Sequence, residues 1–181
     1  MMGSIKNWER LYAQVYRCLK PGGWFEHCDY DPALYSDDGT ILPGSCLDEW
    51  GNLFFEAGER TGQTFRVITD HRNVGWMKDC GFENVMEQRL KLPLGPWAKK
   101  PELKVIGNFN LTATEEGLEG FALYLLTKVF DWSLPKTQMY LAGVRRELRT
   151  PSIHSYYLVY VRCRLFPCCT IPECLMWLDL R

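Results

Sequence analysis

The stretch Cys18-Leu19-Lys20-Pro21-Gly22-Gly23-Trp24-Phe25-Glu26-His27 decides the fold of this chain. Pro21 cannot continue a helix, and the two glycines after it allow the positive-φ backbone of a tight helix exit. The extended run at residues 23–29 therefore follows directly on a helix. A helix that turns at once into a strand is half of an α/β crossover, whose other strand precedes the helix. Only residues 1–6 stand before this helix, so we expect the partner strand to be missing from this sequence.

The helix before the turn is amphipathic. Apolar side chains recur along it at helical spacing, at Trp8, Leu11, Tyr12, Val15 and Leu19. One face of the predicted helix is therefore apolar.

The composition is that of a globular domain. The chain has 181 residues, of which 46% are hydrophobic, enough for one domain with a hydrophobic core. Its formal net charge of -1 predicts no nucleic-acid partner, because such a partner selects a basic surface. No apolar run approaches the roughly 18 residues that a membrane span needs, so no membrane partner is expected.

The eight cysteines do not predict a disulfide framework. Residues 1–10 lack the apolar segment of a signal peptide, so reduced thiols and a cytoplasmic or nuclear protein are expected. Residues 163–181 show no clear hydrophobic periodicity, so we expect a poorly ordered or aberrant tail. Within this tail, a short apolar helix is expected over residues 173–180. The tail is rich in cysteine (Cys163, Cys168, Cys169 and Cys174). Because these spacings match no paired Cys-x-x-Cys site, we expect no metal.

Helices and strands alternate in the next part of the chain. Turn signals predict a loop over residues 30–44. Ser45, three residues before an aspartate, has capping-box spacing and opens a helix that ends near Gly58 or Gly62. A short helix over residues 70–80 follows, and then a strand over residues 82–92, in which apolar and charged residues alternate.

The remainder is predicted to be mostly helical. After a structured loop at residues 93–101, residues 102–148 have a helical pattern throughout. A short helix, a second helix capped by Thr112 and a third opened by Ser133 are expected there. The β-rich run at residues 155–161 should return to the sheet.

Short phrases in order along the chain carry a further signal. They are Gly3-Ser4-Ile5-Lys6-Asn7-Trp8, Leu19-Lys20-Pro21-Gly22-Gly23-Trp24-Phe25-Glu26, Gly39-Thr40, Trp50, Glu56-Ala57-Gly58, Met77-Lys78-Asp79-Cys80-Gly81-Phe82, Leu92-Pro93-Leu94-Gly95-Pro96-Trp97, Gly117-Leu118-Glu119-Gly120-Phe121 and Val144-Arg145-Arg146-Glu147-Leu148. Together they resemble the fungal LaeA-like class I S-adenosylmethionine-dependent methyltransferases over about residues 1–161.

The resemblance implies a fold class and a missing part. Residues 1–162 would be the C-terminal lobe of a Rossmann-like α/β domain, with a helical insert at about residues 101–149. About three strands are expected, parallel at the first two and antiparallel at the last. In the family, the preceding half holds S-adenosylmethionine with a Gly-rich turn and an acidic residue, a logic common to doubly wound sheets. This sequence has no such turn between a strand and a helix, so the resemblance implies a truncated chain without the main cofactor grip.

The resemblance also implies cofactor and base residues, since open α/β sheets bind ligands at the carboxyl ends of their strands. Ser4 and Trp8 are expected near the cofactor. His27 or Glu26 is the candidate catalytic base for the proton of the acceptor. The alternative is that both of these side chains face solvent on the strand.

The methyl acceptor is unknown, and four residues are expected to bind it. Asp29 and Tyr30 lie along or beyond the strand. Trp97 would close the pocket from its loop, and the alternative is that it is a packing anchor. His154 would assist the acceptor, and the alternative is that it is an ordinary surface histidine.

Two functions are therefore compared. The first is an S-adenosylmethionine-dependent methyltransferase, present as an incomplete and inactive fragment. The alternative is a non-catalytic remnant that acts as a protein-interaction module. Without a preceding strand, residues 23–29 form an open sheet edge, which tends to pair with a protein partner or with another copy of the chain.

Overall fold

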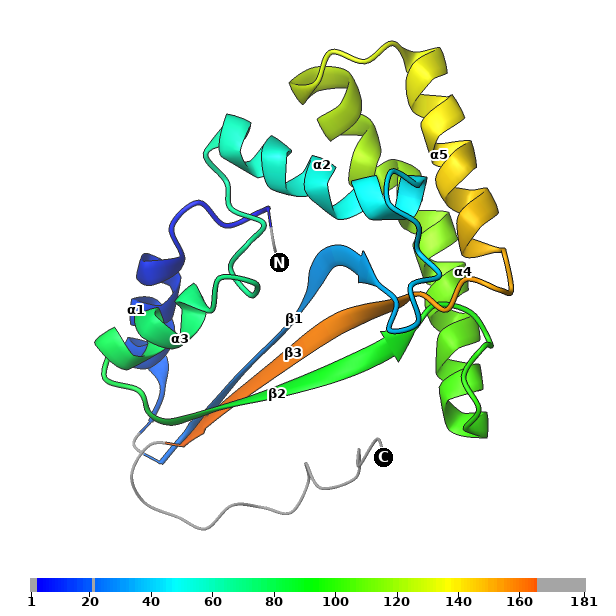
Figure 1. The fold of residues 1–181 in the computed structure, drawn as a ribbon. Helices are drawn as coiled ribbons and strands as arrows, with labels where there is room; N and C mark the ends of the chain where they lie inside the picture. The colour runs from blue at the N-terminus through cyan, green and yellow to red at the C-terminus, as the bar shows by residue number, and fades with distance from the viewer. Residues whose placement is uncertain (1–2, 21, 166–181) are drawn as a thin grey trace.

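The computed structural model describes residues 3–20 and 22–165, which form a mixed α/β structure around a three-stranded sheet (Figure 1). The strands are β1 (Trp24–Tyr35), β2 (Glu83–Pro93) and β3 (Tyr156–Leu165). The helices are α1 (Trp8–Cys18), α2 (Cys46–Thr61), α3 (Arg72–Asp79), α4 (Pro101–Tyr124) and α5 (Leu134–Leu148), and a π-helical segment, η1 (Leu125–Val129), prolongs α4. The expected fold class, with a helical insert before the last strand, is confirmed.

The last strand lies in the middle of the sheet. The strand order is β1-β3-β2, and β3 is antiparallel to both neighbours. Val159 of β3, for example, is opposite Tyr30 on one side and Leu90 on the other. The antiparallel last strand is therefore confirmed. β1 and β2 run in the same direction, but they do not pair with each other, because β3 separates them.

β1 is longer than predicted. It continues to Tyr35, through the first part of the loop expected at residues 30–44. The register shifts between Tyr30 and Leu34, so a bulge carries the strand past Pro32, which cannot donate to a ladder. The Asp31 carboxylate supports the bulge by accepting a hydrogen bond from the Ala33 N–H at 3.0 Å. Among the described strands, only β3 pairs with β1, so the expected open edge is present.

One hydrophobic cluster joins α1 and α3 to the start of the sheet. Asn7 caps α1, and its side chain accepts a hydrogen bond from the Arg10 N–H at 2.8 Å. The buried members of the cluster are Trp8, Tyr12, Val67, Met77 and Phe82. Gly22 has a φ of 79°, which agrees with the tight exit predicted after α1.

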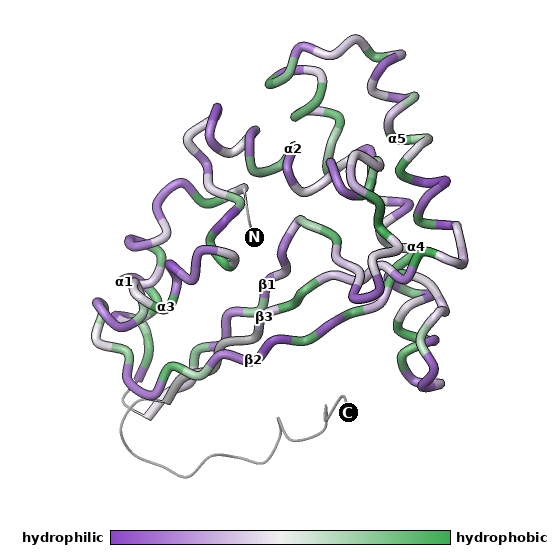
Figure 2. The backbone as a smooth tube through the Cα atoms, in the orientation of Figure 1, coloured by the Kyte–Doolittle hydropathy of each residue, from purple (hydrophilic) through white to green (hydrophobic). Residues whose placement is uncertain are grey.

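A second, larger cluster joins α2, α4 and α5 to the other end of the sheet. As predicted, Ser45 caps α2, and Gly62, with a φ of 68°, ends it. Glu147 of α5 adds a contact across the fold, because its carboxylate accepts hydrogen bonds from the Cys46 and Leu47 N–H groups at 3.1 and 2.9 Å. A carboxylate at a helix N-terminus is favoured by the helix dipole. Figure 2 shows the hydrophobic stretches of these helices interrupted by hydrophilic residues.

α4 is one continuous helix, although the sequence predicted a helix start at Thr112. The Thr112 hydroxyl donates to the Asn108 carbonyl within the helix at 3.1 Å, so Thr112 does not act as an N-cap. Gly107 does not end the helix either. A Cβ at Gly107 would lie 2.0 Å from the carbonyl oxygen of Gly95, whose N–H donates to the Gly107 carbonyl at 2.9 Å. The close approach of the preceding loop therefore requires glycine there.

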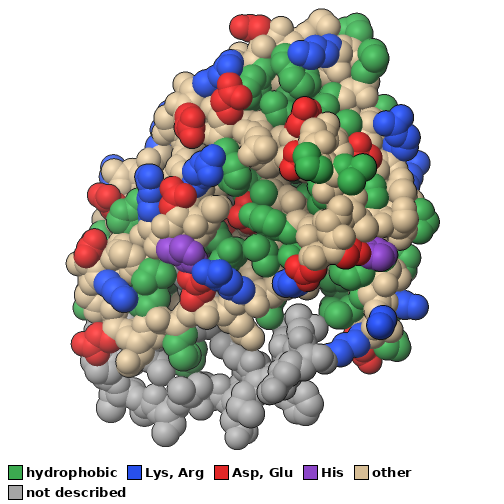
Figure 3. Space-filling model, viewed as in Figure 1, with side chains coloured by type: hydrophobic (Ala, Val, Ile, Leu, Met, Phe, Trp, Pro, Cys, Tyr) green, Lys and Arg blue, Asp and Glu red, His purple; other side chains and the backbone are tan. Residues whose placement is uncertain are grey.

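β3 also extends further than residues 155–161, and it includes the first residues of the segment predicted as a tail. The rest of that segment, including the helix predicted over residues 173–180, lies outside the described residues. Within the described ranges, no helix is long and apolar enough to cross a bilayer. Acidic and basic side chains are intermixed on the face of the molecule in Figure 3.

Replacement of Glu147 by alanine is expected to lower the free energy of unfolding by about 1–3 kcal/mol, because two N–H groups of α2 lose a charged acceptor. Urea denaturation measures the change. Glu116→Ala is the matched control, since Glu116 is exposed on α4, and it should change stability by less than about 0.5 kcal/mol. Equal stabilities of the two variants would show that the contact between α5 and α2 adds nothing.

Candidate functional site

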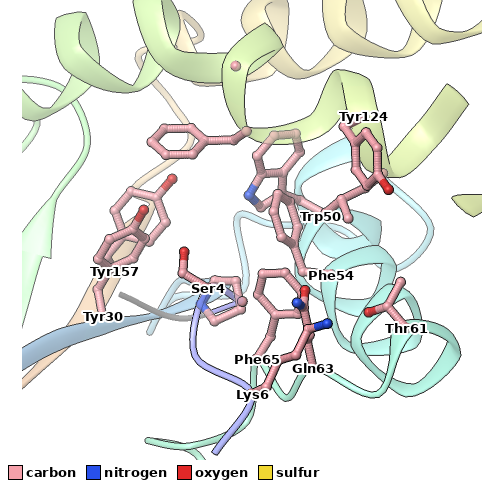
Figure 4. Close-up of a pocket in the computed structure, with 15 residues that line it drawn as sticks. Ser4, Lys6, Tyr30, Trp50, Phe54, Thr61, Gln63, Phe65, Tyr124 and Tyr157 are labelled. Atoms are coloured by element: carbon pink, nitrogen blue, oxygen red, sulfur yellow. The ribbon is translucent and has the colours of Figure 1, made fainter. Parts of the chain in front are cut away.

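A cavity of about 670 Å³ opens beside the second half of β1 (Figure 4). The segment before α1 contributes Ser4 and Lys6, and β1 contributes Tyr30. α2 and α4 supply the opposite wall, with Trp50 and Phe121 among its residues. The volume is in the range of sites that hold small molecules.

Aromatic rings form most of the cavity wall. Tyr30 and Tyr157 lie side by side on adjacent strands, with ring centroids 5.3 Å apart. On the other side, the Phe54 ring lies 4.9 Å from that of Trp50 and 5.5 Å from that of Phe65. Figure 4 shows the tyrosine pair facing the Trp50 and Phe54 side, with Ser4 between them. The space between these walls suits a flat, apolar molecule.

The cavity contains little charge. Among the described residues that line it, Lys6 is the one charged residue, and none is an aspartate, glutamate or histidine. Burial, with a smaller effect from the nearby Asp29 carboxylate, raises the pKa of Tyr30. Burial also raises the pKa of Tyr157. Both phenols therefore stay protonated at neutral pH.

A smaller cavity of about 200 Å³ lies between the sheet and α4. It shares Tyr30, Phe121 and Tyr157 with the larger one. Thr114 and Asn110 of α4 add polar groups to it. The same three rings thus border both spaces.

Of the residues expected at the site, Ser4 and Tyr30 line the larger cavity, but Trp8 does not. Trp8 is the first residue of α1 and is buried with Tyr12 on the inner face of this helix. Its ring centroid lies 5.3 Å from that of His27. The tryptophan therefore packs against the strand.

His27 and Asp29 are buried on the face of β1 that α1 covers. The Tyr12 hydroxyl and His27 Nδ1 share a hydrogen bond at 2.7 Å, and His27 Nε2 lies 3.6 Å from the Asp29 carboxylate. Burial opposes ionisation of Asp29, but the His27 imidazole and the Tyr30 N–H favour it, and the pKa lies below the usual value. Glu26 points to the other face and is exposed, as the two-residue period of a strand requires. Neither candidate base lines the cavity, and only Glu26 faces solvent.

Trp97 and His154 lie together, away from the cavity. Their ring centroids are 5.3 Å apart, and Trp97 Nε1 donates to the Ser155 carbonyl at 3.0 Å. His154 Nδ1 is hydrogen-bonded to Asp38. The structure therefore brings these two expected acceptor residues together, but it does not bring them to Tyr30.

The sequence pattern does not mark five of the lining residues as site residues: Lys6, Trp50, Phe54, Phe65 and Phe121. Lys6, Trp50 and Phe121 lie within the phrases that resemble the family, and this resemblance was the sequence signal that could have marked them as site residues. The helical period placed the rings of α2 and α4 in the core instead. Phe121 is in fact 48% exposed, because it borders the cavity.

Among the described residues that line the cavity, Lys6 is the one charged group that S-adenosylmethionine would meet. S-adenosylmethionine carries a sulfonium, an ammonium, a carboxylate and a ribose, and carboxylates are the usual partners of ribose hydroxyls. Within the described ranges, no carboxylate lines the cavity to hold the ribose, and Lys6 would repel the sulfonium and the ammonium group while attracting the carboxylate. In the same ranges, no group of three His, Cys, Asp or Glu residues could hold a metal ion.

Comparisons with known proteins agree on one group. No family model matches the chain. It is 34% identical to the methyltransferase pytC of Aspergillus terreus over 157 residues, which are 87% of this chain and 48% of pytC. It is 34% identical to the secondary metabolism regulator LAE1 of Cochliobolus heterostrophus over 162 residues, 88% of this chain and 52% of LAE1. It is 32% identical to the protein-methionine methyltransferase laeA of Emericella nidulans over 162 residues, 88% of this chain and 42% of laeA.

Among solved structures, phosphoethanolamine N-methyltransferase 2 of Haemonchus contortus aligns with 93% of this chain and 32% of its own length. The TM-score is 0.41 and the identity is 17%. The chain spans about half the length of the curated relatives that it matches. The resemblance read from the sequence is confirmed: the chain is a homologue of the fungal LaeA-like methyltransferases over about half of their length.

Proposed function

We propose that the described residues form the methyl-acceptor side of an S-adenosylmethionine-dependent methyltransferase, with the aromatic cavity as the acceptor site. The observation that carries the proposal is the 670 Å³ cavity beside β1. Open α/β sheets bind ligands toward the carboxyl ends of their strands, and Tyr30 and Pro32 stand in the second half of β1.

No carboxylate stands among the lining residues that the structure describes, which supports an acceptor site over a cofactor site. In this proposal, the chain as given lacks the cofactor grip of the family and does not turn over. Ser4 is proposed to lie where acceptor and cofactor meet, and Tyr30 to contact the acceptor. His27 and Glu26 as bases, and Trp97 and His154 as acceptor contacts, stay predictions.

A second candidate function rests on β1. This strand has a hydrogen-bonded neighbour on one side only among the described strands, and such an edge can pair with a strand of another chain. A protein-interaction module would use this edge and would not need the cavity.

Filling the cavity tests the proposed acceptor site. Gly120 lines the cavity, and a Cβ there would meet no atom within 4 Å, so Gly120→Phe should fill the space without a backbone clash. We expect the purified chain to bind 1-naphthamide, a flat neutral probe, in a calorimetric titration, and Gly120→Phe to abolish saturable binding.

Gly75→Phe is the matched control, because Gly75 also has open space around its Cβ but lies on α3, away from the cavity. It should bind the probe as the parent chain does. No binding to the parent chain, or equal binding to the two variants, would contradict an acceptor site in this cavity.

The variant Tyr12→Phe tests whether the buried hydrogen bond between Tyr12 and His27 affects binding in the cavity. It removes a buried hydrogen bond, so the free energy of unfolding should fall by about 1–3 kcal/mol in urea denaturation. The affinity for 1-naphthamide should stay unchanged, because neither Tyr12 nor His27 lines the cavity. Tyr124→Phe, at a side chain that is 67% exposed, should leave stability unchanged. Weaker probe binding by the folded Tyr12→Phe variant would link His27 to the acceptor site.

A further inference from the structure

The charge of the larger cavity comes from one side chain. Lys6 is exposed and lines the cavity, and the structure records no ion pair for it within the described residues. Its ammonium group is therefore available to a ligand. In the described part of the chain, no carboxylate lines the cavity to neutralise this ammonium group or to attract a cationic ligand.

The cavity also lacks a group that could accept a proton from a bound acid. None of the lining residues in residues 3–20 and 22–165 is a histidine, aspartate or glutamate, and the buried phenols of Tyr30 and Tyr157 stay protonated at neutral pH. A neutral acceptor that must lose a proton would find no base among the lining residues. An acceptor that is already ionised needs none.

The hydroxyl of Tyr30 can instead donate a hydrogen bond. The structure records no hydrogen-bond partner for this hydroxyl within the described residues, and Figure 4 shows Tyr30 beside Tyr157 on one wall. A hydrogen bond to an ionised oxygen is stronger than one between neutral groups. The opposite wall offers the rings of Trp50 and Phe54 to an apolar, flat body.

We infer that the acceptor bound in this cavity is a flat aromatic acid that enters with an ionised oxygen, held by Lys6 and stacked between the aromatic walls. The inference rests on the proposed function, because it names the substrate class of the same site. An aromatic lining alone would also suit a cation, since ring faces attract cations. The positive charge of Lys6 repels a cation in the same space, and this repulsion favours an anionic ligand over a cationic one.

Three probes of the same shape and different charge test the inference on the full chain by calorimetric titration. They are 1-naphthoate, 1-naphthamide and 1-naphthylmethylammonium. At low salt, the chain should bind naphthoate about threefold to tenfold more tightly than naphthamide, and the ammonium probe most weakly. Added salt should reduce the preference, because it screens an exposed charge.

Variants at Lys6 test whether this side chain causes the preference for naphthoate over naphthamide. Lys6→Met should make the affinities for naphthoate and naphthamide equal, and Lys6→Arg should keep the preference. Lys104→Met is the matched control, since Lys104 is an exposed lysine of α4 outside the cavity lining, and it should keep the preference too. Circular dichroism checks that each variant is folded.

Equal affinities of the parent chain for naphthoate and naphthamide, or tightest binding of the ammonium probe, would overturn the inference and leave the acceptor site in place. A preference for naphthoate that survives Lys6→Met would overturn the role of Lys6. Failure of all three probes to bind would overturn the acceptor site itself, and the inference with it.

Discussion

β1 and β2 are held in one sheet only through β3. The two strands run in the same direction, share no ladder, and each pairs with the strand that comes last in the described chain. The sheet therefore cannot form from its early strands alone. Pairing of β1 with β3 joins residues that are far apart in sequence, for example Trp24 with Leu165, and such long-range closure is slow and costs entropy. The same pairing places Tyr157 beside Tyr30, so the cavity depends on it as well.

The helical insert completes the cavity, and contacts distant in sequence hold it in place. Gly107 lets α4 approach the loop at Gly95, and the Glu147 carboxylate ties α5 to the start of α2. Trp50 of α2 and Phe121 of α4 then face the tyrosines of the sheet across one space. No local motif encodes this arrangement. The larger site is a product of packing between elements, in which Lys6 from the N-terminal segment supplies the charge.

The sequence predicts the features that have local causes. The helix exit at Gly22 and the caps of α2 at Ser45 and Gly62 follow from the φ and hydrogen-bonding preferences of single residues. The antiparallel last strand came from the family resemblance. Other features could not be predicted locally. The bulge that extends β1 past Pro32 depends on pairing with β3, and the continuity of α4 depends on a loop that packs against Gly107. The two-residue period of a strand predicts that Glu26 and His27 point to opposite faces of β1. Only the position of α1 determines that the His27 face is the buried one.

The proposed acceptor site requires that the described residues bind an acceptor without holding the cofactor. Calorimetric titration of S-adenosylhomocysteine into the purified chain tests it most directly, because this product shares the adenosine and amino-acid parts that a cofactor site must hold. The account predicts no saturable heat, since among the described residues no carboxylate lines the cavity to hold the ribose hydroxyls and the ammonium group of this product. Saturable binding with a micromolar Kd would contradict the account and would place a cofactor site within this chain.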